Sequence, residues 1–408
     1  MANTFLTPDI IARESLVVLE NQLLSSTVMS NNVASDFSGA KIGDTIRVKR
    51  PTFFVAEDWG MTHGADVTMQ SAVESSVNVV IEKLYDVSFE VTNSEMSLEI
   101  DQFSSNYLAP AMAALTQKID KYAFGKVKQL GGLSQGGDAT TAYTPLASLA
   151  DIANLSEKLN DQQVPTVGRK MVVSSKQQTK MFAIPEFVRV DHRGGATSPV
   201  IEAQLGRFMG FDVVMSQNMP SHTNGACPDE DLTLTADATV GDTTIGLSGG
   251  GNAEVLLAGD TLRITYNDGI LRDHKVTNTS AQTGSSAGVW TGITISPPIY
   301  GHDEVAVHAT AKIAVTAAKA VTNVSSFDGA ASTYTMSGAF VKEAFELVFI
   351  PQAEPMGPGT SSASVSYNGM SLRVLQTYDH LRKKDMISID AMVGAACVDG
   401  RLGSVITG

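Results

Sequence analysis

The odd positions from Val77 to Val91 are apolar with one exception, Lys83, whereas the even positions are mostly Asn, Glu, Asp and Ser. A period of two places alternate side chains on opposite faces of a strand. The pattern is much longer than a typical strand of about five to six residues. It therefore predicts one extended β-arm and not a compact hairpin.

A helical period begins near the N-terminus. Thr7-Pro8-Asp9 is a helix start, because Thr caps, Pro suits the first turn and Asp complements the helix dipole. Ile10, Val17 and Leu24 follow at seven-residue spacing, with Ile11 and Val18 alongside, and predict an amphipathic arm. The pattern leaves open whether its apolar stripe packs on the same subunit or on a neighbour.

A second helical stripe steps by four and three from about Phe103 to Leu130 and ends before Gly131-Gly132. Pro110 either starts the regular part of this helix or kinks it. The predicted helix is on the order of 40 Å long at roughly 1.5 Å per residue. We expect it to act as a rod around which the rest of a domain is built.

The next segment alternates between helix and strand. Thr144-Pro145 predicts a helix start, Met171-Val172-Val173 a strand, and Ser174-Ser175 a cap for a further helical turn. The stretch from Val200 to Phe208 has a helical pattern, and Gly210 to Met215 is typical of a strand. This block is predicted to be mixed α and β.

From about Gly225 to His308 the composition changes to Thr, Gly, Asp and short β-type runs. Turn signals such as Gly249-Gly250-Gly251 and Asn267-Asp268-Gly269 separate these runs. We predict a small all-β domain inserted between mixed segments. Helical and strand patterns return from Ala339 onward.

The charge distribution limits the functions that fit. The chain has 29 basic and 43 acidic residues, a formal charge of −14 and a sequence pI near 4.9, so it repels polyanions and a DNA-binding regulator is not expected. Two basic clusters stand out: Arg47, Lys49 and Arg50, then Arg382, Lys383 and Lys384. Each is either a solvated strand or turn, or a contact with acidic surface on a neighbouring copy.

The sequence contains none of the common catalytic motifs: no GxxxxGK[ST], HExxH, CxxC or GxSxG. His302 and His308 are near neighbours, but no third ligand accompanies them, and the acidic run at 228–231 is better explained as a solvated loop. We therefore expect no catalytic residues, no cofactor and no metal.

The two cysteines, Cys227 and Cys397, form neither a disulfide framework nor a zinc site and fit a reducing compartment. No run of about 18 apolar residues predicts a membrane span, and the first residues do not resemble a secretory signal. We expect a protein made in the cytosol of the producing cell.

Several stretches, in this order and spacing, resemble the major capsid proteins of tailed double-stranded DNA phages, in particular the short-tailed-phage group with an inserted β-domain. They are Gly210 to Pro220, Ala258 to Leu262, Ala339 to Pro351, Asn368 to Val374, Tyr378-Asp379 and Ile389 to Gly394. The closing segment Val398 to Arg401 departs from the group, since it lacks a Tyr-Pro pair.

The resemblance implies an α+β chain with the tailed-phage capsid fold and an inserted all-β domain. The implied division is an N-terminal arm (1–40), an extended loop (41–75), a peripheral domain with the spine helix (76–137), an axial domain (138–224), the inserted β-domain (225–319) and a return to the axial and peripheral domains (320–408).

By the same resemblance, the protein assembles as hexamers and pentamers into an icosahedral virion shell with scaffolding and portal proteins. It encloses double-stranded DNA without reading its sequence and contacts no membrane. Two alternatives remain: a cellular nanocompartment shell of the same fold, and a secreted β-rich adhesin. The adhesin would need an export signal, and the long helix has no purpose in it.

Overall fold

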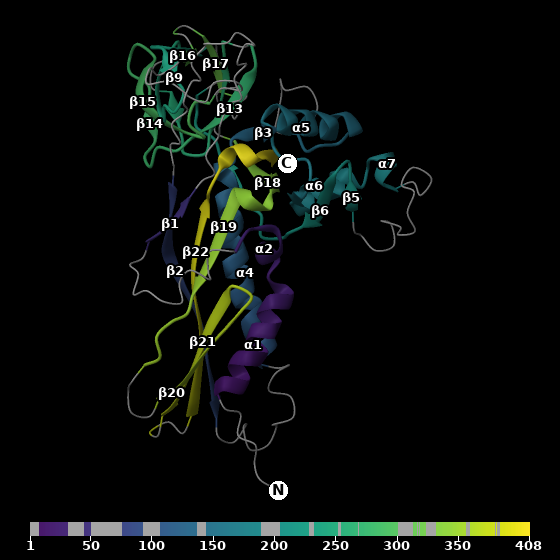
Figure 1. Ribbon diagram of the computed structural model, residues 1–408, viewed down its shortest axis with the longest axis vertical. Coiled ribbons are helices and arrows are strands. Elements are labelled where there is room, and N and C mark those ends of the chain that lie inside the picture. Colours follow the sequence, from purple (N-terminus) through teal and green to yellow (C-terminus); the bar gives the residue numbers. More distant parts are fainter. Residues whose placement is uncertain are drawn as a thin grey trace, which may run out of the picture. The chain divides into compact units, whose positions relative to one another are not determined.

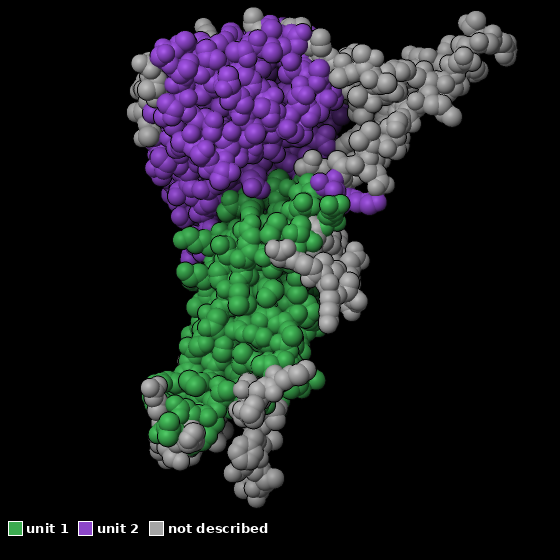
Figure 2. All heavy atoms as spheres, turned by 90° about the vertical axis from the view of Figure 1, so that its left-hand side faces the viewer, with its two compact units in different colours: residues 1–48, 77–126, 345–398 green, residues 49–76, 127–344, 399–408 purple. Residues whose placement is uncertain are grey.

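The computed structural model describes most of the chain. The described residues are 8–31, 45–49, 76–92, 107–136, 144–188, 205–227, 232–251, 254–267, 269–300, 313–315, 317, 319–323, 332–355, 360–379, 381 and 384–408. They divide into two compact units, coloured separately in Figure 2. Unit 1 is 1–48, 77–126 and 345–398, and unit 2 is 49–76, 127–344 and 399–408.

A six-stranded sheet organises unit 1, in the order β1-β2-β22-β21-β20 with β19 also paired to β22. The strands are β1 (Thr45–Lys49), β2 (Ser76–Thr92), β19 (Phe345–Ile350), β20 (Thr360–Tyr367), β21 (Met370–Asp379) and β22 (Lys384–Cys397). The predicted β-arm is thus one strand of 17 residues, which runs antiparallel to β22 with one register shift between Ile81 and Lys83. The alternation buries odd residues of β22 such as Ile387 and Ile389.

Helices cover one face of this sheet (Figure 1): α1 (Pro8–Gln22), α2 (Leu24–Val28) and α4 (Ala109–Gly125). The Tyr122 ring of α4 contacts Tyr85 of β2 edge to face, with 6.4 Å between ring centroids. Helix α1 lies against α4 and the β20–β21 hairpin. The buried face of the N-terminal arm therefore packs on its own subunit, which is one of the two alternatives that the sequence pattern left open.

The predicted apolar stripe of α1 is only partly buried. Ile10 and Val17 are 46% and 57% exposed, whereas Ile11, which lies alongside them, is buried together with Leu16 and Leu19. Contact with α4 and the hairpin therefore turns the helix so that the side of Ile11 faces inward.

The N-terminus of α2 is capped from α4 and not by its own residues. Its N-cap, Leu23, has no capping side chain, and the backbone N–H of Ser25 donates to Asp120 Oδ1 at 3.0 Å. Burial raises the pKa of Asp120 even though hydrogen bonds from this helix end favour the carboxylate. A carboxylate at a helix N-terminus also complements the helix dipole, so Asp120 fixes the arm against α4.

The α-helical part of the predicted long helix is α4. It starts at Ala109, so Pro110 lies in its first turn and does not kink it, and the last turn tightens into the 3-10 helix η4 (Lys126–Gln129). Residues 103–106 lie outside the described part of the chain.

Unit 2 contains a seven-stranded mixed sheet in the order β3-β23-β18-β4-β6-β5, with β7 also paired to β18. The strands are β3 (Gly132–Ser134), β4 (Arg169–Val173), β5 (Gly206–Phe208), β6 (Phe211–Met215), β7 (Ser221–Thr223), β18 (Thr333–Val341) and β23 (Gly403–Thr407). The remaining elements of this block are α5 (Leu149–Asp161), α6 (Ser175–Met181), α7 (Pro185–Val188), η5 (Lys342–Ala344) and η6 (Gly400–Leu402). The strands at 171–173 and 210–215 and the helical turn capped by Ser174 agree with the sequence patterns.

Two predicted helices differ in this block. Helix α5 starts at Leu149 and not at Thr144, because Ser148 and Asp151 form a capping box that fixes the first turn. The end of the stretch predicted as helical, 200–208, is strand β5, since pairing with β6 through a tight hairpin overrides the local pattern. Residues 200–204 lie outside the described part.

The second half of unit 2 is a closed barrel in the order β10-β15-β13-β12-β17-β8. Its strands are β8 (Leu232–Leu234), β10 (Thr244–Ser248), β12 (Thr261–Thr265), β13 (Leu271–Val276), β15 (Val289–Ser296) and β17 (Ala320–Asn323). Two short strand pairs accompany the barrel: β9 (Ala238–Thr239) pairs with β16 (Ile313–Val315), and β11 (Val255–Leu256) pairs with β14 (Gln282–Thr283). Trp290, Ile264 and Leu247 are buried in its core. Strand β17 closes the barrel between β12 and β8.

Strand β13 buries four consecutive polar residues, Arg272, Asp273, His274 and Lys275. Asp273 receives two hydrogen bonds from Arg263, at 2.7 and 2.9 Å, and one from the backbone N–H of Leu133 in β3. Lys158 of α5 donates to the carbonyl of the same Leu133 at 2.7 Å. Both main-chain groups of one β3 residue are therefore satisfied by charged side chains, one from the barrel and one from the mixed block.

A second polar contact joins the same two parts. Asp260, which is fully buried in the barrel, accepts a hydrogen bond from His222 Nε2 of β7 at 3.0 Å and one from the backbone N–H of Leu257 at 2.8 Å. Gly259 adopts a φ of +100°, and a Cβ there would lie 2.9 Å from the His222 ring. Only glycine fits this approach, so the turn that carries Asp260 is fixed against β7.

We expect a fragment of residues 225–324 to fold alone, because it contains all six barrel strands. A fragment that ends at 310 lacks β17 and leaves β12 and β8 with unpaired edges, which favours aggregation. The longer fragment should give a dispersed amide spectrum and a cooperative unfolding transition, and the shorter one should give neither. Equal stability of the two would show that β17 does not close the barrel.

Burial lowers the pKa of His274 to about 4, while the unfolded chain protonates this side chain near pH 6.5. The unfolded state then binds more protons between these values, so barrel stability should fall as the pH drops from about 6.5 to about 4, by on the order of 3 kcal/mol. Urea unfolding followed by Trp290 fluorescence in a Trp59→Phe chain measures this fall. His274→Asn should remove most of the pH dependence, and an unchanged profile in that variant would contradict the assignment.

Candidate interaction surface

The face of the unit 1 sheet opposite the helices carries a row of charged residues. Asp86 of β2 lies directly opposite Asp390 of β22, and Asp390 lies directly opposite Arg373 of β21. Ser88 and Ser388 form the next row, and Glu90 and Met386 the one after. We call this set of residues, with Leu84, the open face.

The open face combines exposed apolar side chains with carboxylates. Leu84 is 56% and Met386 44% exposed. The Glu90 side chain is 59% exposed and is 2.6 Å from Lys384 Nζ. Isolated exposed apolar residues are ordinary on protein surfaces, and here Leu84 and Met386 lie beside the carboxylates Asp86 and Glu90.

Two carboxylates on the open face occupy positions that oppose one another. Burial raises the pKa of Asp390, and the neighbouring Asp86 raises it further, although Arg373 Nη2 approaches Asp390 Oδ2 to 2.5 Å. Burial also raises the pKa of Asp86, but hydrogen bonds from Ser388 and Ser88 outweigh this and hold the pKa below its ordinary value. Like charges directly opposite one another are unfavourable in a sheet, but here Arg373 pairs with Asp390 and hydrogen bonds favour the charged form of Asp86, which offsets that cost.

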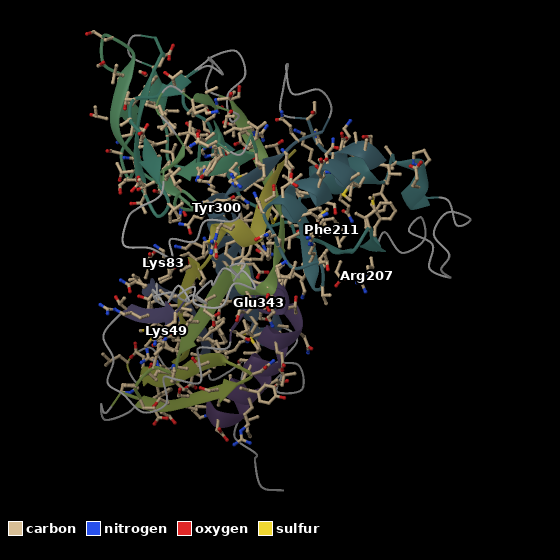
Figure 3. The ribbon with its side chains drawn as sticks, turned by 45° about the horizontal axis from the view of Figure 1, so that its top comes forward. Lys49, Lys83, Arg207, Phe211, Tyr300 and Glu343 are labelled. Atoms are coloured by element: carbon tan, nitrogen blue, oxygen red, sulfur yellow. The ribbon has the colours of Figure 1, made fainter. Side chains whose placement is uncertain are left out.

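The structure places the predicted contact residues as follows. Arg47 and Lys49 are exposed on β1, the edge strand next to β2, and Figure 3 labels Lys49. Lys384 starts β22 and forms the ion pair with Glu90 in the same chain. Arg50, Arg382 and Lys383 lie outside the described residues, as do His302, His308 and the acidic run at 228–231.

No sequence pattern identifies the open face as a unit. Asp86 is hundreds of positions away from Arg373 and Asp390 in the sequence, and only the register of three strands brings the three residues into one row. An acidic residue on the polar side of an alternating strand is expected, so the pattern alone did not distinguish Asp86 from its neighbours.

Within the part of the chain that the structure describes, no group of three or more His, Cys, Asp or Glu side chains is placed to hold a metal ion. The described helices include none that is long and apolar enough to cross a membrane. Burial raises the pKa of the Cys227 thiol to about 12, which makes this cysteine a poor nucleophile.

Residues 76–255 match the family model described as phage capsid protein. This segment runs from β2 through α4 and the mixed block into the barrel. The match identifies a phage capsid protein domain in this part of the chain, and the recognition made from the sequence is confirmed.

Several solved structures are similar over most of the chain. That of Mycobacterium phage Che8 is 12% identical, with 94% of this chain and 90% of the other covered and a TM-score of 0.49. The capsid of Cyanophage P-SCSP1u is 10% identical, with 90% and 84% covered and a TM-score of 0.46. A virus-like particle from Pyrococcus furiosus is 8% identical, with 97% of each chain covered and a TM-score of 0.41.

No curated protein matches the sequence. The assignment therefore depends on the family match, and that match favours neither the nanocompartment nor the adhesin alternative.

Replacing Asp86 by Asn should lower the pKa of Asp390, because it removes the neighbouring carboxyl group that raises it. The same change should destabilise the isolated subunit by about 0.5–1 kcal/mol, because the Asp86 carboxylate accepts hydrogen bonds from Ser88 and Ser388. A carboxyl titration by NMR and urea unfolding midpoints measure the two effects. Ser88→Ala, on the same strand face, is the control for lost hydrogen bonding, and an Asp86→Asn subunit at least as stable as the unaltered one would show that the carboxylate does not serve the fold.

Proposed function

We propose that this capsid protein assembles as hexamers and pentamers into an icosahedral shell that encloses double-stranded DNA, with no catalytic role. The observation that supports the proposal most is the family match over residues 76–255. Scaffolding and portal proteins are the expected partners, and the host cytoplasm is the expected place of assembly. The net charge of −14 suits a container for DNA, since an acidic inner surface does not adhere to phosphate.

The proposed domain division follows the sequence prediction with one change. The arm (1–40), extended loop (41–75), peripheral domain (76–137) and axial domain (138–224) keep their limits. The inserted β-domain extends beyond 319 to Asn323, because β17 is part of the barrel. The return segment then runs from 324 to 408.

We assign Arg47, Lys49 and Arg50 to a contact with the open face of a neighbouring copy. The argument is charge complementarity: exposed cations lie at one edge of the sheet, and the carboxylates Asp86 and Glu90 lie on its uncovered face. Such a contact joins two different patches, and a head-to-tail contact of this kind closes into rings. Arg382, Lys383 and Lys384 remain candidates for a second contact.

The function is tested by expression of the chain with its scaffolding protein, followed by sedimentation and electron microscopy. Closed shells with five-fold and six-fold capsomers are expected. A chain that stays monomeric under every assembly condition contradicts the proposal.

Reversal of Arg47, Lys49 and Arg50 to Glu should block or misdirect assembly, because like charges at an interface cost several kcal/mol. The monomer should melt normally, since exposed ion pairs contribute only about 0–1 kcal/mol to stability. The defect should weaken with salt, as the Debye length falls from about 10 Å at 0.1 M to about 3 Å at 1 M.

Shell yield across a salt series and monomer thermal melts are the measurements. Reversal of Asp86 and Glu90 to Lys in the same chain should restore shells if the two patches meet. Normal shells from the triple Glu variant at low salt would exclude this contact.

A further inference from the structure

Four edge strands of the two large sheets in the described part of the chain have a feature that blocks further strand pairing. Unpaired strand edges are a template for another strand, and proteins protect them with charges, short length or covering groups. Strand β1 carries the exposed Arg47 and Lys49. Strand β5 has only three residues and carries Arg207, whose side chain is 70% exposed (Figure 3).

Two further edges are covered. Strand β19 exchanges backbone hydrogen bonds with Ser30, from Ser30 N–H to Phe345 O at 3.1 Å and from Leu347 N–H to Ser30 O at 2.8 Å. Strand β3 is closed by the side chains of Asp273 and Lys158 on Leu133. Each of these edges is unsuited to a new strand.

Strand β20 differs from all four. It is the outermost strand of its sheet and pairs only with β21 among the described strands. Its eight residues, Thr-Ser-Ser-Ala-Ser-Val-Ser-Tyr, include no charge and no proline. Ser361, Ser366 and Tyr367 are exposed, and the residues between them are half-buried. This edge has the length and the chemistry to accept another strand.

The order of residues in β20 indicates which strand can pair with its free edge. About Ser364 the sequence is nearly palindromic: Ala363 mirrors Val365, and Ser362 mirrors Ser366. In an antiparallel pair centred on Ser364, serines face serines on one side of the sheet and small apolar residues face each other on the other. Hydroxyl pairs of this kind stabilise adjacent strands.

Charge also favours a second copy as the partner. The chain carries a net charge of −14, so two copies approach at the lowest electrostatic cost where neither surface is charged. We infer that β20 pairs with β20 of another copy across a two-fold axis, which joins the two sheets into one. This inference rests on the proposed function for its partner, a second subunit, and adds a contact separate from the basic clusters.

Cysteine crosslinking of the full chain tests the register. Ser364→Cys faces itself across the axis and should form disulfide-linked dimers in assembled shells under mild oxidation. Ser362→Cys alone should crosslink poorly, whereas the chain with both Ser362→Cys and Ser366→Cys should crosslink well. The unaltered chain, whose Cys227 is buried, is the background control.

A charge placed on the edge tests its importance. Ser364→Lys should reduce shell yield at least tenfold and leave the monomer melt unchanged. Asn78→Lys adds the same charge at an exposed position of β2, outside the open face and away from this edge, and it should affect the β20 contact little. Rescue of Ser364→Lys by Ser364→Glu chains mixed with it would support direct pairing.

The outcomes separate this inference from the proposed function. Shells that form normally with Ser364→Lys and give no Ser364→Cys dimers overturn the β20 pairing and leave the shell function intact. Dimers with Ser362→Cys alone but not with Ser364→Cys overturn the palindromic register. A Ser364→Cys chain and an unaltered chain that both form no shells, together with the absence of crosslinked dimers, overturn both the β20 pairing and the proposed shell function.

Discussion

The pairing of β22 on both of its edges is the constraint on which unit 1 depends. One side of β22 follows β2 from Lys384 to Gly394, and the other side pairs first with β21 and then with β19. Strands far apart in the sequence are thereby fixed in register, and a slip of one residue would turn every buried side chain outward. The helices α1 and α4 then find a continuous apolar face to cover.

The same register produces the open face. Asp86, Asp390 and Arg373 form one row only because three strands align there. Burial raises the pKa of Asp390, and Asp86 opposite it raises that pKa further, while Arg373 and Ser388 favour its charged form. We take the row to be an acceptor for basic residues of a neighbour, in agreement with a capsid subunit that must associate despite its negative charge.

In unit 2 the inserted barrel is attached to the mixed block by polar contacts. The barrel uses buried charged side chains for this, with Asp273 and Arg263 on one β3 residue and Asp260 on His222 of β7. Buried ion pairs contribute little net stability, but loss of one partner is costly. Such contacts therefore favour one orientation of the barrel on the mixed block over many.

The sequence by itself determined the local elements. A period of two predicted strand β2, and a capping serine predicted helix α6. Short β-type runs between turn signals predicted the strands of the inserted domain, because each of these signals acts over a few residues. It also showed the basic clusters and the family resemblance. Only the tertiary structure decided which face of α1 is buried, where the barrel closes and that 206–208 pairs as a strand. The tertiary structure alone also aligns the rows of the open face and leaves the edge of β20 uncovered. These features depend on which distant segments become neighbours, and no local period encodes that choice.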